Sequence, residues 1–362
     1  MSDKSPLALG QVVETLRNEG HLDSALVEAA EPRLARLDDA TPWYVRAMVG
    51  FGAWVASLLL IGFVAGFSLQ AGGVVALGIV LIVAALTLRW FYHNDFVVQA
   101  TLATSLAGQA LLIFGLNDDG YGGNWASQLS ITAMVVSAVL LVVFPDRIHR
   151  LLSVLFFFAS LVVLMYAQQL SAWIVLPGPL AAAALVAVQH WRSTLFSRGL
   201  GRYVWPLENG LMLSAFGILM ISTLYLLPEV SEFAFYPRPW ISTLLLGGLL
   251  MFVLVGGARA RLSQNKLEEA LLYGLSALII GAAWAAPGLI LALLVTVLGL
   301  NKAQRGLMAA GIGFLVIFLV AYFYGIQVSM PVKAASMMLS GGVLLLACWA
   351  LRRLHTPNEA QA

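Results

Sequence analysis

Two tyrosines and one lysine near the end of the chain are the first candidates for chemistry. Lys333 falls in the first turn of a predicted helix over 332–351, where a cation opposes the helix macrodipole. Tyr322 and Tyr324 end the preceding predicted helix, one short loop away, and their hydroxyl groups could compensate this charge. Acidic residues that we predict on the same side of the membrane as Lys333 could also compensate its charge: Asp118, Asp119, Glu229 and Glu232. The alternative is that Lys333 extends to lipid headgroups and has no specific role.

Glu208 is the fourth candidate residue. It is followed by Asn209 and Gly210 and leads into a predicted helix over 209–227. The macrodipole stabilises a carboxylate near the start of a helix whatever its role. Glu208 is therefore interpreted either as a functional carboxylate at a membrane interface or as an ordinary favourable helix start.

Catalytic and ligand-binding motifs are absent from the sequence. It contains no zinc-protease, serine-hydrolase or Walker pattern, and its five histidines are dispersed. The single cysteine, Cys348, excludes an intramolecular disulfide and a thiolate metal site. The run 117–124 has oxygen ligands but lacks the ligand spacing and terminal glutamate of a calcium loop, which favours a hydrated turn over a cation site. We expect no enzyme activity, no cofactor and no metal.

The amino-acid composition indicates the class of protein to which these candidate residues belong. Of the 362 residues 60% are hydrophobic and 10% are charged, and the mean hydropathy is +0.89, whereas an average soluble domain has about 25% charged residues. Thirteen of the 38 charges lie in the first 46 residues. The remainder of the chain is too poor in polar residues to cover a surface in water, and we expect it to be a membrane domain.

Twelve apolar runs are long enough to cross a bilayer, or nearly so, as helices. They are 47–67, 73–89, 96–116, 126–144, 151–167, 172–189, 209–227, 240–257, 267–283, 286–300, 306–324 and 332–351. Because every backbone polar group must be satisfied within lipid, these runs predict α-helices. The predicted fold is all-α: a polytopic helical membrane protein with 12 transmembrane helices.

Two pairs of runs leave the number of crossings open at ten to twelve. Within 151–189 the break between runs is short and the second run contains Pro177 and Pro179, and 267–300 is interrupted near Pro287. Each pair of runs begins and ends on the same side of the membrane. The distribution of Lys and Arg between the two sides therefore cannot distinguish two spans from a re-entrant hairpin. A discontinuous helix can mark a transporter binding site, but a proline there also suits an ordinary helix start.

The distribution of cations predicts the orientation. With the N-terminus in the cytoplasm, 18 of the 20 Lys and Arg residues fall inside and only Arg238 and Lys333 fall outside, as the positive-inside rule requires. Both termini are therefore expected in the cytoplasm, with a helical hairpin and linker over 1–42, a transmembrane domain over 43–352 and a cytoplasmic tail over 353–362. The N-terminal segment is acidic, which argues against a nucleic-acid partner.

Two segments resemble a known family. The run 41–60, TPWYVRAMVGFGAWVASLLL, and the run 321–336, AYFYGIQVSMPVKAAS, resemble the bacterial multi-pass family called domain of unknown function 4401. In that family a similar aromatic cluster precedes a lysine like Lys333, although Ala334 stands where a serine is expected. The resemblance implies no activity. It implies a companion membrane protein, encoded nearby, that carries a Gly-Asp-Tyr motif.

Two functions remain open from the sequence. A subunit or scaffold of a membrane assembly, related to the cell envelope, is favoured because the spans are poor in polar residues and rich in glycine, as at Gly62 and Gly66. The alternative is a carrier or permease for an apolar or lipid-like solute, without intramembrane ion coupling, since no charged residue lies near the centre of a predicted span. Either would lie in the bacterial inner membrane with the lipid bilayer as its surroundings.

Overall fold

The computed structural model describes most of the predicted membrane domain. The described residues are 71–92, 95–117, 125–224, 238–261 and 286–325, with isolated positions between 48 and 63 and between 274 and 281, and residues 331 and 338. These residues form helices and short connections, with no strand among them. The chain divides into two compact units, Met1–Gly115 and Leu116–Ala362, which we call the N-terminal unit and the C-terminal unit.

In the N-terminal unit, α4 (Ala71–Phe91) and α5 (Asp95–Gly115) form an antiparallel pair. Gly78 and Gly108 let the two backbones touch, because a Cβ atom added to Gly108 would lie 2.8 Å from the carbonyl oxygen of Gly78. Small residues allow this close approach in membrane helices, where van der Waals packing replaces the hydrophobic effect. A larger residue at either position would push the helices apart.

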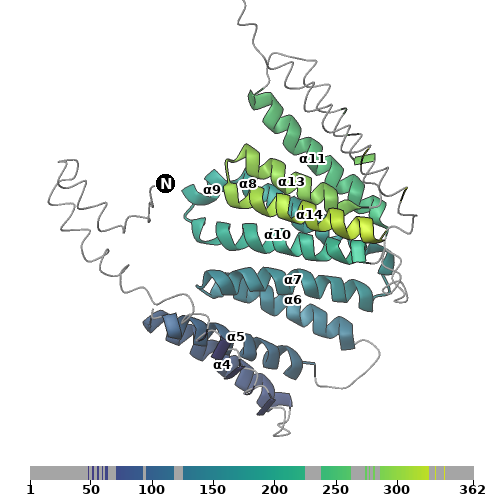
Figure 1. Cartoon of the computed structure of the whole chain (residues 1–362). Helices are drawn as coiled ribbons and strands as arrows, with labels where there is room; N and C mark the ends of the chain where they lie inside the picture. Colours follow the sequence, from purple (N-terminus) through teal and green to yellow (C-terminus); the bar gives the residue numbers. More distant parts are fainter. Residues whose placement is uncertain are drawn as a thin grey trace, which may run out of the picture. The chain divides into compact units, whose positions relative to one another are not determined.

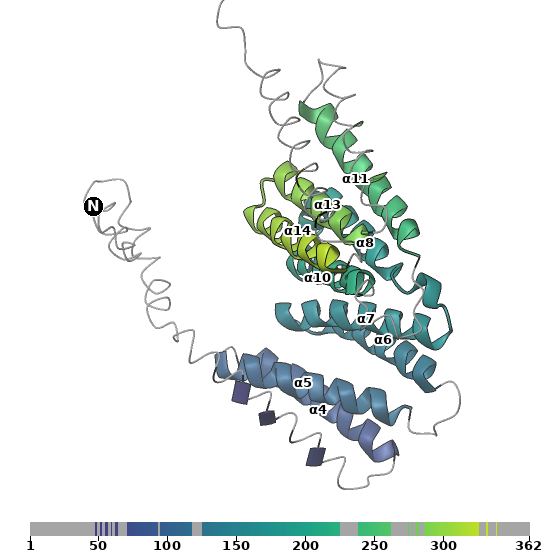
Figure 2. The same cartoon turned by 45° about the vertical axis from the view of Figure 1, so that its right-hand side comes forward.

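The C-terminal unit is built around α10 (Figures 1 and 2). Its described elements are α6 (Trp125–Val143), α7 (Arg147–Ala167), the short 3-10 helix η1 (Ser171–Trp173), α8 (Pro177–His190), α9 (Arg192–Ser197), α10 (Gly201–Leu224), α11 (Pro239–Arg261), α13 (Pro287–Asn301) and α14 (Arg305–Gly325). α10 packs against α7 on one side and against α8, α13 and α14 on others. Figure 1 shows α10 between the α6–α7 pair and the α13–α14 pair.

The core of this unit is apolar and aromatic. Phe216 of α10 stacks on Phe314 of α14, with ring centroids 3.8 Å apart. Buried aliphatic residues of α8, α10, α11 and α13 surround this pair: Leu185, Leu219, Leu246, Leu250, Ile290, Leu291 and Leu294. Many large apolar side chains elsewhere on these helices are exposed, as expected of helices whose outer surfaces face lipid rather than water.

Seven helical segments of the described residues are long and apolar enough to cross a membrane. They correspond to the predicted runs from 73–89 to 240–257. Shorter apolar segments, Pro287–Asn301 of α13 and Arg305–Ala321 of α14, lie at the predicted runs 286–300 and 306–324. The predicted runs 47–67, 267–283 and 332–351 lie outside the described residues, apart from isolated positions. The hairpin and linker over 1–42 and the tail over 353–362 also lie outside them.

Two helices begin four or more residues before their predicted starts. α7 begins at Arg147, four residues before 151, and α10 begins at Gly201, eight residues before 209. Hydropathy identifies only the apolar part of a helix, whereas backbone hydrogen bonding continues into the polar residues at its end. Glu208 therefore lies inside α10 rather than before it.

The pair of runs within 151–189 has a geometry that favours two crossings. At the end of α7, Gln168 donates a hydrogen bond to Ser127, near the start of α6, so α7 retraces the length of α6. The following segment returns along α10, because Gly178 contacts Leu219 near the end of α10 and Arg192 reaches Glu208 near its beginning. A re-entrant hairpin would not extend this far.

Candidate functional site

Polar contacts concentrate where α7, α10 and α14 begin and α6, α8 and α13 end. We call this the basic end of the C-terminal unit. Contacts between these helix ends join α7 to α10, α8 to α10, and α8 to the α13–α14 connection. Its cations are Arg147, Arg150, Arg192, Arg198, Arg202, Lys302 and Arg305. Among the described residues at this end the acids are Asp146 and Glu208.

Glu208 is buried within this end and paired with Arg192. Its residue is 8% exposed, and its Oε1 atom lies 3.5 Å from Nη1 of Arg192, whose side chain is 37% exposed. This separation makes an ion pair rather than a hydrogen bond, and Oε1 has no hydrogen-bond partner. At 1.5 Å of rise per residue, Glu208 lies roughly 10 Å into α10. It is the ionisable side chain farthest from a helix end among the described helices.

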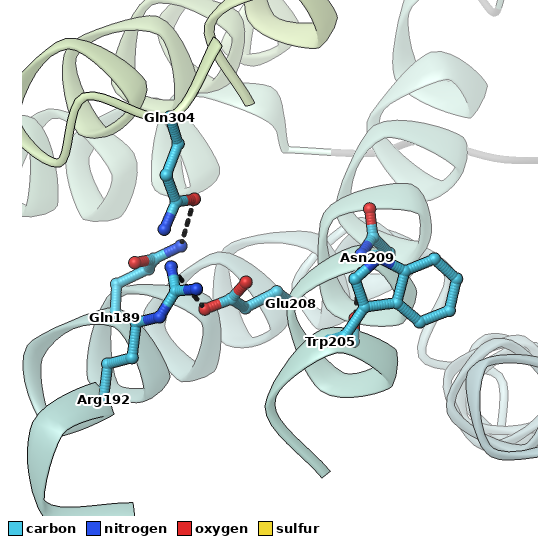
Figure 3. Close-up of polar contacts among 6 residues, drawn as sticks. All are labelled: Gln189, Arg192, Trp205, Glu208, Asn209 and Gln304. Carbon is cyan, nitrogen blue, oxygen red and sulfur yellow. Dashed lines mark hydrogen bonds and ion pairs between the residues drawn. The ribbon is translucent and has the colours of Figure 1, made fainter. Parts of the chain in front are cut away.

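A second buried contact lies beside this ion pair (Figure 3). Gln189, near the end of α8 and 1% exposed, donates a hydrogen bond from Nε2 to Oε1 of Gln304, at 3.2 Å. Gln304 lies in the connection between α13 and α14. The four residues Gln189, Arg192, Glu208 and Gln304 form what we call the polar tie, because they join α8 and α9 to α10 and to the α13–α14 pair.

A third contact depends on a proline inside α10. Pro206 lacks a backbone N–H, so the carbonyl of Arg202, four residues earlier, loses its helical donor. Nη1 of Arg150, on α7, donates to that carbonyl oxygen instead, at 3.4 Å. Arg150 is 3% exposed, and its guanidinium lies 4.2 Å from the centre of the Tyr203 ring.

Arg202 approaches the same tyrosine. Its guanidinium lies 5.0 Å from the centre of the Tyr203 ring, and its Nη2 donates to the hydroxyl of Tyr203 at 3.2 Å. The Tyr203 hydroxyl in turn donates to the carbonyl of Val142 at the end of α6. We call Arg150, Arg202 and Tyr203 the arginine–tyrosine clamp, since two cations contact one aromatic ring.

The start of α7 is fixed by Asp146 and by a buried histidine. Asp146 caps the helix, because its Oδ2 accepts hydrogen bonds from the backbone N–H groups of Ile148 and His149, both at 3.0 Å. The His149 ring is stacked on Phe144 with centroids 4.0 Å apart, and its Nδ1 lies 3.3 Å from the hydroxyl of Ser153. Asp146 therefore caps α7, and its negative charge interacts favourably with the positive end of the helix dipole.

The structure separates the candidate residues named from the sequence. Tyr324, 75% exposed, ends α14 about 20 residues after its start at the basic end, a distance of roughly 30 Å along the helix. Glu208 lies at the basic end, so these two do not share a site. Tyr322 lies on the backbone of α14 and its side chain is not described, and Lys333 lies outside the described residues.

The partners of Glu208 and the residues of the clamp were not among the predicted site residues. Arg192 is one of the 18 cations on which the predicted orientation depends, and Gln189 and Gln304 are 115 positions apart, so neither contact has a signal in the sequence. A signal for the clamp was present, since a proline four residues after Arg202 leaves a carbonyl without its helical donor. Within the described part of the chain no three His, Cys, Asp or Glu side chains gather to hold a metal.

Comparison with known proteins matches most of the chain to a protein family. The family model described as Domain of unknown function (DUF4401) matches residues 42–354. No curated protein matches the chain, and no solved structure matches it.

Proposed function

Because this chain belongs to the domain of unknown function 4401 family, we propose its role from its own contacts: it is a subunit or scaffold of a membrane assembly. The protein lies in the bacterial inner membrane with both termini in the cytoplasm, and it acts without catalysis. Its partner is a companion membrane protein encoded nearby, and the assembly serves the cell envelope.

The polar tie carries this proposal. Arg192 pairs with Glu208, and Gln189 bonds to Gln304, so the buried polar groups at this end hold neighbouring helices together. Ionisable side chains of the described helices lie within about two or three turns of a helix end. Transport driven by an ion would use such groups deeper in the membrane.

The tie also opposes helix motion. A carrier must move one group of helices against another to expose its site alternately to the two sides. The tie joins α8, α10 and the α13–α14 connection at one end, and the apolar core joins the same helices along their lengths. Helices that are held together both at one end and along their lengths are suited to a scaffold.

Co-purification tests the assembly. The full chain is expressed with a tag beside the untagged companion protein and extracted in a mild detergent. We expect a complex of defined stoichiometry whose mass exceeds that of the 38.9 kDa chain. The matched control uses an unrelated multi-pass protein as bait. A chain that purifies without the companion under conditions that preserve other membrane complexes would contradict the proposal.

A cross-link distinguishes the scaffold from the carrier. In a Cys348→Ser background, Gln189→Cys and Gln304→Cys are joined by a short bismaleimide linker, and each single variant serves as a control. A scaffold retains binding of the companion when this end is locked. The opposite result is that no sample binds the companion and that the cross-link abolishes complementation of a deletion strain. That result would favour the alternative, a carrier or permease for an apolar or lipid-like solute.

The orientation has its own test. The cation distribution predicts that a phosphatase reporter fused after Gly123 is active and one fused after Ser197 is inactive. Ser197 ends α9 at the basic end, which the proposal places in the cytoplasm. The reverse activity at either fusion would contradict this orientation.

A further inference from the structure

We propose that the arginine–tyrosine clamp binds the phosphate of an anionic phospholipid in the cytoplasmic leaflet. The proposal depends on the membrane location and the orientation given above. It does not depend on whether the chain is a scaffold or a carrier.

The positions of the two clamp arginines are set by the helices. Arg150 is held by the carbonyl that Pro206 leaves without a donor, and it is buried between α7 and α10. Its Nε atom is also buried and has no hydrogen-bond partner. Arg202 is exposed, and its contact with the Tyr203 hydroxyl uses Nη2. A guanidinium has five N–H donors, so Arg202 retains donors that can reach phosphate oxygens.

The charges around the clamp are unbalanced. Two guanidinium groups lie within 5.0 Å of the centre of one tyrosine ring, and exposed Arg147 lies one turn before Arg150 on α7. Of the described acids at this end, Asp146 caps α7 and Glu208 is buried with Arg192. Like charges gathered in this way attract an anion, and phosphate oxygens are suitable acceptors for arginine.

The residues beside the clamp favour a lipid over a free phosphate ion. Exposed apolar and aromatic side chains lie within two residues of the clamp in the chain: Ile148, Leu200 and Trp205. The exposed ring of Phe196 packs against Gly201, the residue before Arg202. Tryptophan at the end of membrane helices lies at the level of lipid headgroups. A phospholipid can place its phosphate on the exposed guanidinium of Arg202 and its acyl chains along these apolar residues, whereas a free ion gains only the first contact.

Lipid binding to the full chain tests the proposal. The purified protein is titrated with phosphatidylglycerol, and with phosphatidylcholine as the zwitterionic comparison, while native mass spectrometry measures bound lipid. We expect phosphatidylglycerol to bind more tightly than phosphatidylcholine. Arg202→Gln should weaken phosphatidylglycerol binding about tenfold, because it removes charge-assisted hydrogen bonds to the phosphate.

Arg305→Gln is the matched control. Arg305 is another exposed arginine of the basic end, but it starts α14 and is not part of the clamp. It should change lipid affinity less than twofold, whereas Arg202→Lys, which keeps the charge, should retain most of the binding. Unchanged thermal stability of each variant shows that folding is not the cause.

Three results would overturn the proposal. Equal losses for Arg202→Gln and Arg305→Gln would show a diffuse charge effect without a clamp. Equal binding of the two lipids would show that charge has no role. Displacement of the lipid by millimolar inorganic phosphate would show that the arginines bind a free ion. Failure to bind the companion protein leaves these measurements unaffected, so the two proposals fail separately.

Discussion

The two ends of the C-terminal unit are held by different kinds of contact. At the basic end, Arg192 pairs with buried Glu208 and Arg150 donates to a backbone carbonyl of α10. At the opposite end, two contacts between described residues are neutral: Gln168 donates to the hydroxyl of Ser127 at 3.3 Å, and the backbone N–H of Arg238 donates to the carbonyl of Ala172 at 3.1 Å.

Some of the cations on which the proposed orientation depends also join helices at the basic end. Cations accumulate on the side that is not translocated, and here several of them also enter contacts between helices. A charge that orients the chain can then contribute to its folded state. The following predictions test whether charged contacts at one end stabilise the unit more than neutral contacts at the other.

Arg150→Ala should have the largest effect. The variant removes the donor to the Arg202 carbonyl and the contact with Tyr203, and it leaves a buried carbonyl unpaired. We expect a loss of about 2–3 kcal/mol in the free energy of unfolding, measured by unfolding in mixed detergent–SDS micelles. Pro206→Ala supplies the missing N–H, so Arg150→Ala should cost less in that background. An equal cost in both backgrounds would show that Arg150 does not replace the helical donor.

Glu208→Gln should have an intermediate effect. The variant removes the charge of Glu208 and keeps its shape, and because Arg192 is partly exposed we expect a loss of about 1 kcal/mol. Arg192→Gln should produce a similar loss, and the double variant should lose less than the sum of the two. Additive losses in this cycle would mean that the two residues do not interact in the folded protein.

Gln168→Ala at the opposite end should have a smaller effect. It removes one neutral hydrogen bond between α7 and α6, and such bonds contribute about 0.6 kcal/mol on average between membrane helices. Ser127→Ala should give the same loss in the same unfolding measurement. A loss as large as that of Arg150→Ala would remove the distinction between the two ends.

Tyr324→Phe should have the smallest effect. The side chain is exposed at the end of α14, and exposed substitutions usually change stability by less than about 0.5 kcal/mol. Lys333→Gln should be equally silent if this lysine only reaches the headgroups. The melting temperature in detergent and complementation of a deletion strain are the measurements. Loss of complementation at unchanged stability would identify a functional site at this end.

Helix positions could be predicted from the sequence more fully than helix contacts. The runs 73–89, 96–116 and 126–144 agree with α4, α5 and α6 to within two residues, because a helix in lipid must be apolar over its whole length. The start of α10 was missed because its first residues include Arg202, Pro206 and Glu208, which hydropathy assigns to a loop. The polar tie was missed for another reason, since it joins residues that have no relation in sequence.

Composition and periodicity thus set the class of the protein, the apolar segments and the side on which each cation is expected, since hydrocarbon excludes charge and unsatisfied backbone groups. Tertiary structure decided which of those cations contact a neighbouring helix. Glu208 meets Arg192 only because α8 and α9 return along α10, and Arg150 meets the Arg202 carbonyl only because α7 starts beside α10. Pairing of this kind depends on how helices are placed against one another, and local sequence does not encode that placement.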